Sequence, residues 1–180
     1  IRRDCSDPTL KMDLVAHSMG GLIARYYLRY GARDVLDDNA LKPTLEGSRK
    51  VRRAILLGTP NLGSTTSLHG FLGGHPIGFS SVPPEALASM PSTYQLFPHP
   101  LNVWLVDARG EELLRDLFDV ELWRHFQWSV FNPALRAQLR DDGWNEERLA
   151  AFERYFEKRL ERARRFVWAL SREVPAMETQ

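Results

Sequence analysis

The stretch MDLVAHSMGGLIARYYLRYG, residues 12–31, constrains the fold more than any other part of the sequence. It opens with an apolar run typical of a strand and continues with apolar residues at helical spacing. These patterns predict a buried strand over 11–16 and a helix over 20–30. Gly31 stands where a left-handed C-terminal cap is expected. A histidine, a serine and two glycines occupy the junction, where the chain has to turn sharply.

A second apolar run, VRRAILLG over 51–58, predicts another buried strand after a polar loop at 34–49. Strand, helix and strand in this order favour a right-handed βαβ unit, in which helices cover a parallel sheet, so the predicted fold class is α/β. Residues 60–100 are rich in Gly, Pro and Ser and predict a long excursion with short helical pieces rather than more sheet. A short strand and turn are expected at 102–110.

The clearest helix is predicted over 146–172, because apolar residues recur at spacings of three and four from Leu149 to Leu170. Asn145 is the expected N-cap, and Pro175 bars continuation of the helix. The arginines of this helix are expected to form a solvated face. Contact with a membrane surface or with a partner protein are the alternative roles considered for it.

Composition excludes several classes of protein. The chain has 180 residues, 43% hydrophobic and 26% charged, which is enough for a globular core. Its net charge of +1, from 24 basic and 23 acidic residues, offers no concentrated basic surface, so no nucleic-acid partner is expected. The single Cys5 excludes an internal disulfide framework and a Cys-based zinc cluster, and neither a cofactor nor a metal is expected. The sequence has no apolar run of about 18 residues, so no transmembrane segment is expected. Oligomeric state and localisation stay open.

Ser18, at the junction between the predicted strand and helix, is the candidate catalytic residue. A free serine hydroxyl is a poor nucleophile, and it needs a base within hydrogen-bond reach and donors for the oxyanion. A tight strand-to-helix turn pushes the side chain out of the sheet edge. It also aims the backbone N–H of Met19, at a helix N-terminus, toward the same point. We therefore interpret Ser18 as a nucleophile and Met19 as an oxyanion donor.

Small residues are needed around such a turn because the strand and the helix approach each other closely there. Ala16 and Gly20 take these positions, and Gly21 adds further room, so AHSMGG departs mildly from the usual G-x-S-x-G pattern of a nucleophile elbow. His17 supports the elbow and points the wrong way along the strand to act as the base. A chance turn rich in Gly and Ser is the structural alternative.

Three motifs in order, DLVAHSMGGLIARYYL, RRAILLGTPNLGS and MPSTYQLFP, resemble the lecithin:cholesterol acyltransferase-like branch of the α/β-hydrolases. LFDVELWRHFQWSVFNP is similar to the matching region of bacterial members. The resemblance implies that Ser18 forms an acyl-enzyme with a lipid ester and passes the acyl group to an alcohol or to water, as an O-acyltransferase, lipase or esterase does. It places 58–64 beside the active site and 90–98 in a cap over the pocket, where a rigid packed loop is the favoured interpretation.

The resemblance also divides the chain. Residues 1–64 would be the central part of the hydrolase core with the elbow, 65–145 a cap- or lid-like insertion, and 146–172 the amphipathic helix. The remainder of the hydrolase fold is expected outside the chain at both ends.

The sequence shows no clear acid and base to act with Ser18. In this fold the acid and then the histidine follow later strands, and no two further buried strands are predicted after residue 58. We therefore expect the acid and the base outside this chain, and expect the 180-residue piece alone to be inactive. Asp107 and His125 stand in the right order for an internal triad, but at short spacing and with His125 in a predicted helix. A catalytically silent hydrolase-fold binding protein is the alternative function.

Overall fold

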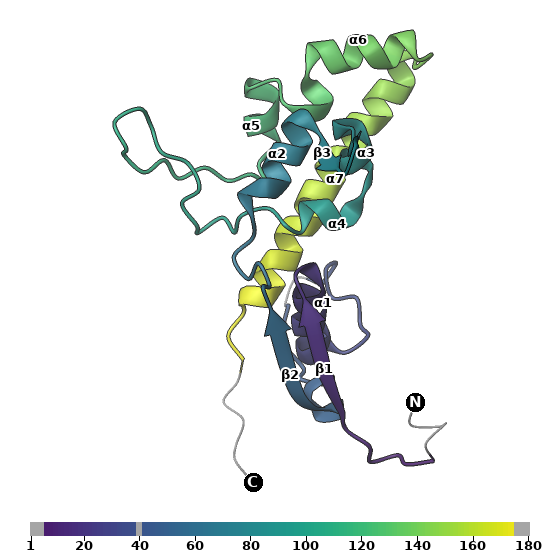
Figure 1. The fold of residues 1–180 in the computed structure, drawn as a ribbon, viewed down its shortest axis with the longest axis vertical. Helices are drawn as coiled ribbons and strands as arrows, with labels where there is room; N and C mark the ends of the chain where they lie inside the picture. The colour runs from purple at the N-terminus through teal and green to yellow at the C-terminus, as the bar shows by residue number, and fades with distance from the viewer. Residues whose placement is uncertain (1–5, 39–40, 175–180) are drawn as a thin grey trace. The chain divides into compact units, whose positions relative to one another are not determined.

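The computed structural model describes residues 6–38 and 41–174, so Cys5 and Pro175 lie outside the described residues. Packing divides the chain into two units, and each is described by itself. The first unit holds residues 6–38, 41–61 and 166–174, and the second holds residues 62–165. The architecture is mixed α/β, with a small parallel sheet in the first unit and mostly short helices in the second (Figure 1).

The first unit is built on a two-stranded parallel sheet. Strands β1 (Met12–His17) and β2 (Val51–Leu57) pair with Val15 opposite Ile55. Figure 1 shows the two strands side by side, pointing the same way, with α1 (Met19–Tyr30) against them. The predicted order of strand, helix and strand is confirmed, and so is the parallel pairing.

The prediction that both strands are buried is wrong. Val15 is 68% exposed, and Ile55 and Leu57 are each 49% exposed. Half-buried and exposed residues alternate along β1, as they do on a strand with one covered face. Within the described part of the chain this sheet has two strands and α1 contacts both of them, so the outward-pointing apolar side chains are left uncovered.

Asp13, the polar exception in the first apolar run, has a partner on the neighbouring strand. Its carboxylate accepts two hydrogen bonds from Arg52, from Nε to Oδ1 at 2.9 Å and from Nη2 to Oδ2 at 2.6 Å. These bonds lower the pKa of Asp13. Both side chains lie at the surface, so the pair fixes strand alignment more than it adds stability.

Helix α1 ends where the sequence predicts. Gly31 caps it with a φ of +64°, and the Gly31 N–H donates to the carbonyl oxygen of Tyr27 at 2.8 Å. The ψ of −137° differs from that of the expected left-handed cap. A glycine is required here for the positive φ and because a Cβ would come within 3.2 Å of the Glu46 side chain.

Tyr30 ties α1 to two distant parts of the first unit. Its ring is fully buried, and its hydroxyl donates to the carbonyl oxygens of Leu41 and Ala169, each 2.9 Å away. Burial raises the pKa of this phenol. One turn earlier, Tyr26 stacks on Phe166 with ring centroids 5.6 Å apart. The buried side of α1 therefore depends on residues at the far end of the sequence.

The second unit consists mainly of short helices and one hairpin. In chain order its elements are α2 (Thr65–Gly73), β3 (His75–Ile77), β4 (Ser80–Val82), α3 (Pro84–Ser89), α4 (Pro91–Tyr94), α5 (Val120–His125), the 3-10 helix η2 (Ser129–Phe131) and α6 (Pro133–Asp141). The 3-10 helix η1 (Ser48–Lys50) belongs to the first unit, directly before β2. The antiparallel β3–β4 pair was not predicted. The expected strand at 102–110 is reduced to one isolated bridge, from Val106 to Glu112.

The core of the second unit is a cluster of aromatic rings. Its fully buried members are Phe71, Tyr94, Phe97, Trp123 and Phe156. Ring centroids are 4.8 Å apart for Phe71 and Phe97 and 5.0 Å apart for Trp123 and Phe156, and most pairs meet edge to face. Such pairs contribute about 0.5–1.5 kcal/mol each beyond the area they bury. The burial of Tyr94 and Phe97 agrees with a rigid, packed loop over 90–98.

The long helix α7 covers Glu146–Ser171, close to the predicted span. The Asn145 side chain accepts a hydrogen bond from the Arg148 N–H at 2.8 Å, which confirms the expected N-cap. The helix is long but heavily charged. Among the described residues no helix combines the length and the apolar character needed to cross a bilayer.

Candidate active site

Ser18 occupies the turn between β1 and α1 in a strained conformation. Its φ is +52° and its ψ is −128°, a combination that residues other than glycine rarely adopt. Two backbone hydrogen bonds hold the turn. The Ser18 N–H donates to the Leu57 carbonyl at 2.9 Å, and the Gly21 N–H donates to the Ser18 carbonyl at 3.0 Å. The first bond extends the β1–β2 ladder, so the sheet itself places Ser18.

The hydroxyl of Ser18 is exposed and has no structural task. Serine at a helix N-terminus usually accepts a bond from the first turn, but Ser18 makes no such side-chain cap. The N–H groups of Ser18 and Gly21 already have acceptors, which leaves those of Met19 and Gly20 as the donors that the helix itself cannot satisfy. An exposed hydroxyl therefore stands beside unsatisfied donors at the positive end of a helix dipole.

The tightest contact around the turn involves Thr59, which lies in the segment 58–64 that the resemblance places beside the active site. A Cβ on Gly20 would lie 4.0 Å from the Cβ of Ala16, an ordinary contact, whereas a Cβ on Gly21 would lie 1.8 Å from Oγ1 of Thr59. Thr59 follows β2 in the motif GTPNLGS. Its hydroxyl is buried and has no hydrogen-bond partner among the described residues. Thr59 thus packs against the start of α1 by shape alone.

His17 ends β1 directly before Ser18. It pairs in register with Leu57 and its side chain is exposed. The role expected for His17, support of the turn, stays a prediction.

Arg25 connects α1 to the segments around it. Its Nη1 donates to Oδ1 of Asn61 at 3.0 Å, and its Nη2 donates to the Leu170 carbonyl at 3.0 Å. Partial burial lowers the pKa of this guanidinium, with a smaller contribution from the nearby charge of Arg29. Arg25 thereby fixes the loop after β2 next to α1. No local sequence pattern pointed to it, because both acceptors lie far along the chain.

The family model described as lecithin:cholesterol acyltransferase matches residues 7–161. The chain belongs to the lecithin:cholesterol acyltransferase family. The suspected resemblance is confirmed, and membership of this family indicates acyltransferase or esterase chemistry on a lipid substrate. The comparisons matched no curated protein and no solved structure to the chain.

The internal triad considered for this family member gains no support from the side-chain contacts. Oδ1 of Asp107 accepts from the N–H groups of Arg109 and Glu111, at 2.7 and 2.9 Å, and so closes its own turn. His125 meets the ring of Phe126 edge to face. In the described chain no hydrogen bond joins Asp107 to His125.

His99 is the buried histidine of the Gly/Pro-rich region. Its Nδ1 accepts from the Leu101 N–H at 3.2 Å, and burial lowers its pKa against the opposing effect of the Asp116 charge. His69 and His75 are exposed.

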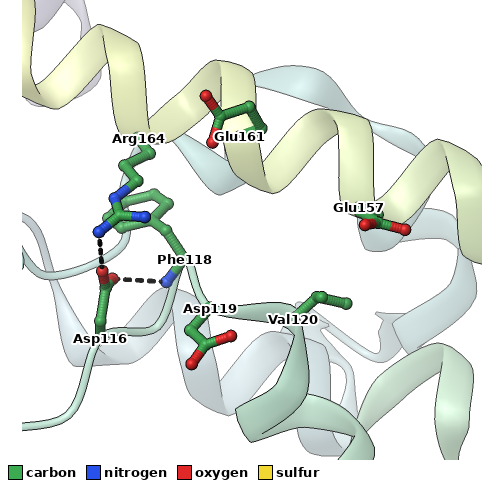
Figure 2. A pocket seen from close by; sticks show the side chains of 7 residues that line it. All are labelled: Asp116, Phe118, Asp119, Val120, Glu157, Glu161 and Arg164. Atoms are coloured by element: carbon green, nitrogen blue, oxygen red, sulfur yellow. Dashed lines mark hydrogen bonds and ion pairs between the residues drawn. The ribbon is translucent and has the colours of Figure 1, made fainter.

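A pocket of about 540 Å³ lies in the second unit, between the start of α5 and the side of α7 (Figure 2). Its lining residues are Asp116, Phe118, Asp119, Val120, Glu157, Glu161 and Arg164. Arg164 pairs with Oδ2 of Asp116 at 2.9 Å, and Oδ1 of Asp116 accepts from the Phe118 N–H. Asp119 caps α5. The wall contains no Ser, Cys, His or Lys, so this pocket supplies no hydroxyl, thiol or amine nucleophile and no histidine base. Across the described residues no three His, Cys, Asp or Glu side chains are placed to hold a metal ion.

Proposed function

We propose that the chain carries the nucleophile of a serine-dependent acyl-transfer enzyme, of α/β-hydrolase fold, that acts on lipid-like esters. The observation that carries the proposal is the backbone of Ser18. A serine at φ +52° costs stability that a glycine would not cost, yet its hydroxyl does nothing for the fold. A strained backbone at a serine whose side chain does not stabilise the fold is typical of a nucleophile elbow. Membership of the family supports a lipid ester as the substrate.

In the proposed reaction, Oγ of Ser18 attacks the ester carbonyl carbon while a general base takes the hydroxyl proton. The resulting oxyanion accepts a hydrogen bond from the Met19 N–H, at the N-terminus of α1. Collapse of the tetrahedral intermediate expels the alcohol with that proton and leaves an acyl-enzyme. An acceptor alcohol or water then takes the acyl group by the reverse steps. We propose that the base and the acid come from residues outside this chain.

Covalent labelling tests the proposal directly. A fluorophosphonate probe should add once to the natural full-length protein, and the adduct should map to the peptide that holds Ser18. Ser18→Ala should abolish the labelling. Ser6→Ala is the matched control, because Ser6 is also an exposed serine with a φ of +52° but does not stand between a strand and a helix. Labelling that survives Ser18→Ala would refute the assignment of the nucleophile.

A catalytically silent binding protein is the second candidate. One observation favours it: no base is hydrogen-bonded to the Ser18 hydroxyl among the residues that the structure describes. A full-length protein that binds a lipid ester but neither reacts with the probe nor turns the ester over would support this function. Stoichiometric labelling of Ser18 would exclude it.

A further inference from the structure

The β3–β4 hairpin presents apolar side chains at its turn. Ile77 pairs with Ser80 across a two-residue loop formed by Gly78 and Phe79. Gly78 has a φ of +58°, the positive value that the first loop residue of a type II′ turn requires. Phe79 is fully exposed, and Ile77 is 60% exposed. A Cβ on Gly78 would find no atom within 4 Å, so the turn stands free of the rest of its unit.

The base of the hairpin, in contrast, is fixed. Gly74 ends α2 with a φ of +84°, and its N–H donates to the Gly70 carbonyl at 2.9 Å. A Cβ on Gly70 would come within 3.0 Å of Cδ1 of Leu87, which shows how closely α2 and α3 approach. The hairpin is therefore an outward projection between two packed helices. Because the turn is already ordered, it would lose little conformational entropy on binding to a surface.

The absence of charge distinguishes this hairpin from the exposed apolar segment around Leu101 and Val106. No Lys, Arg, Asp or Glu occurs from Gly70 to Pro84, whereas Leu101 and Val106 share their segment with Asp107, Arg109 and two glutamates. The two strands of the hairpin also pair with each other, so the N–H and C=O groups that face the partner strand are hydrogen-bonded. Immersing the turn in an apolar medium therefore desolvates no formal charge and few backbone groups.

We propose that the β3–β4 hairpin is a lipid-surface anchor. Phe79 and Ile77 enter the acyl-chain boundary of a zwitterionic lipid surface, while His75 and the hairpin serines stay at the headgroup level. We choose a zwitterionic lipid because the hairpin has no Lys or Arg to attract an anionic headgroup or an acidic protein. The choice of lipid over a protein partner rests on the proposed function, since a lipid ester is presented at such a surface.

Vesicle binding tests the anchor without any need for catalysis. The full chain is sedimented with phosphatidylcholine vesicles, and the bound fraction is measured against lipid concentration. Phe79→Ser should lower the partition coefficient on the order of tenfold to 100-fold, because burial of one such ring is worth that much. Phe79→Trp should preserve binding, since Trp favours the interface. Leu101→Ser is the matched control: Leu101 is 71% exposed in the same unit, and this variant should bind like the parent.

The outcomes separate the possibilities. Equal binding by Phe79→Ser and the parent overturns the anchor, as does an equal loss in Leu101→Ser. Loss of binding between about 0.1 M and about 1 M salt, where screening removes electrostatic attraction, would assign the contact to the arginines of α7 instead. Far-UV circular dichroism confirms that each variant is folded. Failure of the Ser18 labelling would leave the vesicle result unaffected, so the two proposals fail independently.

Discussion

Replacing Gly21 with alanine is expected to destabilise the first unit because Thr59 already fills the space. The three nearest atoms to the new Cβ all belong to Thr59: Oγ1 at 1.8 Å, Cγ2 at 2.6 Å and Cβ at 2.7 Å. Rotation about χ1 of Thr59 moves the first two atoms but leaves its Cβ in place. The backbone after β2 or at the start of α1 must therefore shift, and overpacking of this kind costs about 1–3 kcal/mol.

Gly20→Ala is the control that isolates this cost. Both glycines lie in the first turn of α1 and both variants gain helix propensity, by up to about 1 kcal/mol. The new Cβ of Gly20→Ala meets only the Cβ of Ala16, at 4.0 Å. The difference between the two variants is thus the overpacking alone. For a chain of this size, 1 kcal/mol corresponds to about 2–4 °C in Tm, so Gly21→Ala should melt about 2–12 °C below Gly20→Ala.

Thermal unfolding followed by far-UV circular dichroism measures the difference. Adding Thr59→Ala should recover part of the loss, because it removes Oγ1 and Cγ2 but leaves the Cβ at 2.7 Å. The buried Thr59 hydroxyl has no partner to lose, so Thr59→Ala alone should cost little from hydrogen bonding. The reasoning is refuted if Gly21→Ala melts at or above Gly20→Ala, or if the two substitutions combine without coupling.

Three further outcomes are expected. Ser18→Gly should raise the unfolding free energy by about 1 kcal/mol in a urea titration, because it relieves the positive φ, while it abolishes probe labelling; a drop in stability would show that the turn is not strained. Tyr30→Phe should cost about 1–3 kcal/mol at neutral pH, since it leaves buried carbonyls without a donor. In the unsubstituted protein the folded-state pKa of Tyr30 lies above the ordinary 10.0. Above that pH the folded state therefore keeps a proton that the unfolded state loses. Parent stability should therefore fall as the pH rises above about 10, and less so in Tyr30→Phe; parallel pH profiles would contradict this. Gly63→Ala should cost at least about 2 kcal/mol in the same titration, because its φ is +86° and its Cβ would lie 2.2 Å from the Phe97 carbonyl oxygen; parent-like stability would show that this loop is free to move.

Local patterns in the sequence predicted the elements whose causes are local. The period of the apolar residues and Gly31 located α1, and the same kind of period with Asn145 located α7. The strand-to-helix junction at Ser18 was predicted for the same reason. Each of these features depends on residues within a few positions of one another.

Features that depend on distant residues escaped prediction. The exposure of Val15 and Ile55 reflects which faces of the sheet are covered, which an apolar run does not encode. The resemblance placed 58–64 beside the active site, but the direct contact of Thr59 with Gly21 depends on how closely α1 approaches the end of β2, which neither motif encodes. The β3–β4 hairpin was missed because its strands are three residues long and one holds a proline, although the pair Gly78 and Phe79 at its turn was a usable signal.

The first unit is built from segments that precede and follow the second unit in the sequence, and this sets an order of events during synthesis. Tyr30 and its acceptor Ala169 are 139 residues apart, and Arg25 needs the carbonyl of Leu170. At about 5–20 residues per second, a ribosome takes about 7–28 s to make the intervening chain. The second unit is complete in sequence before that moment. The segment that holds Ser18 is therefore made before the second unit but receives its contacts with residues 169–170 only after that unit is made, and until then this side of α1 is open to chaperones and to aggregation.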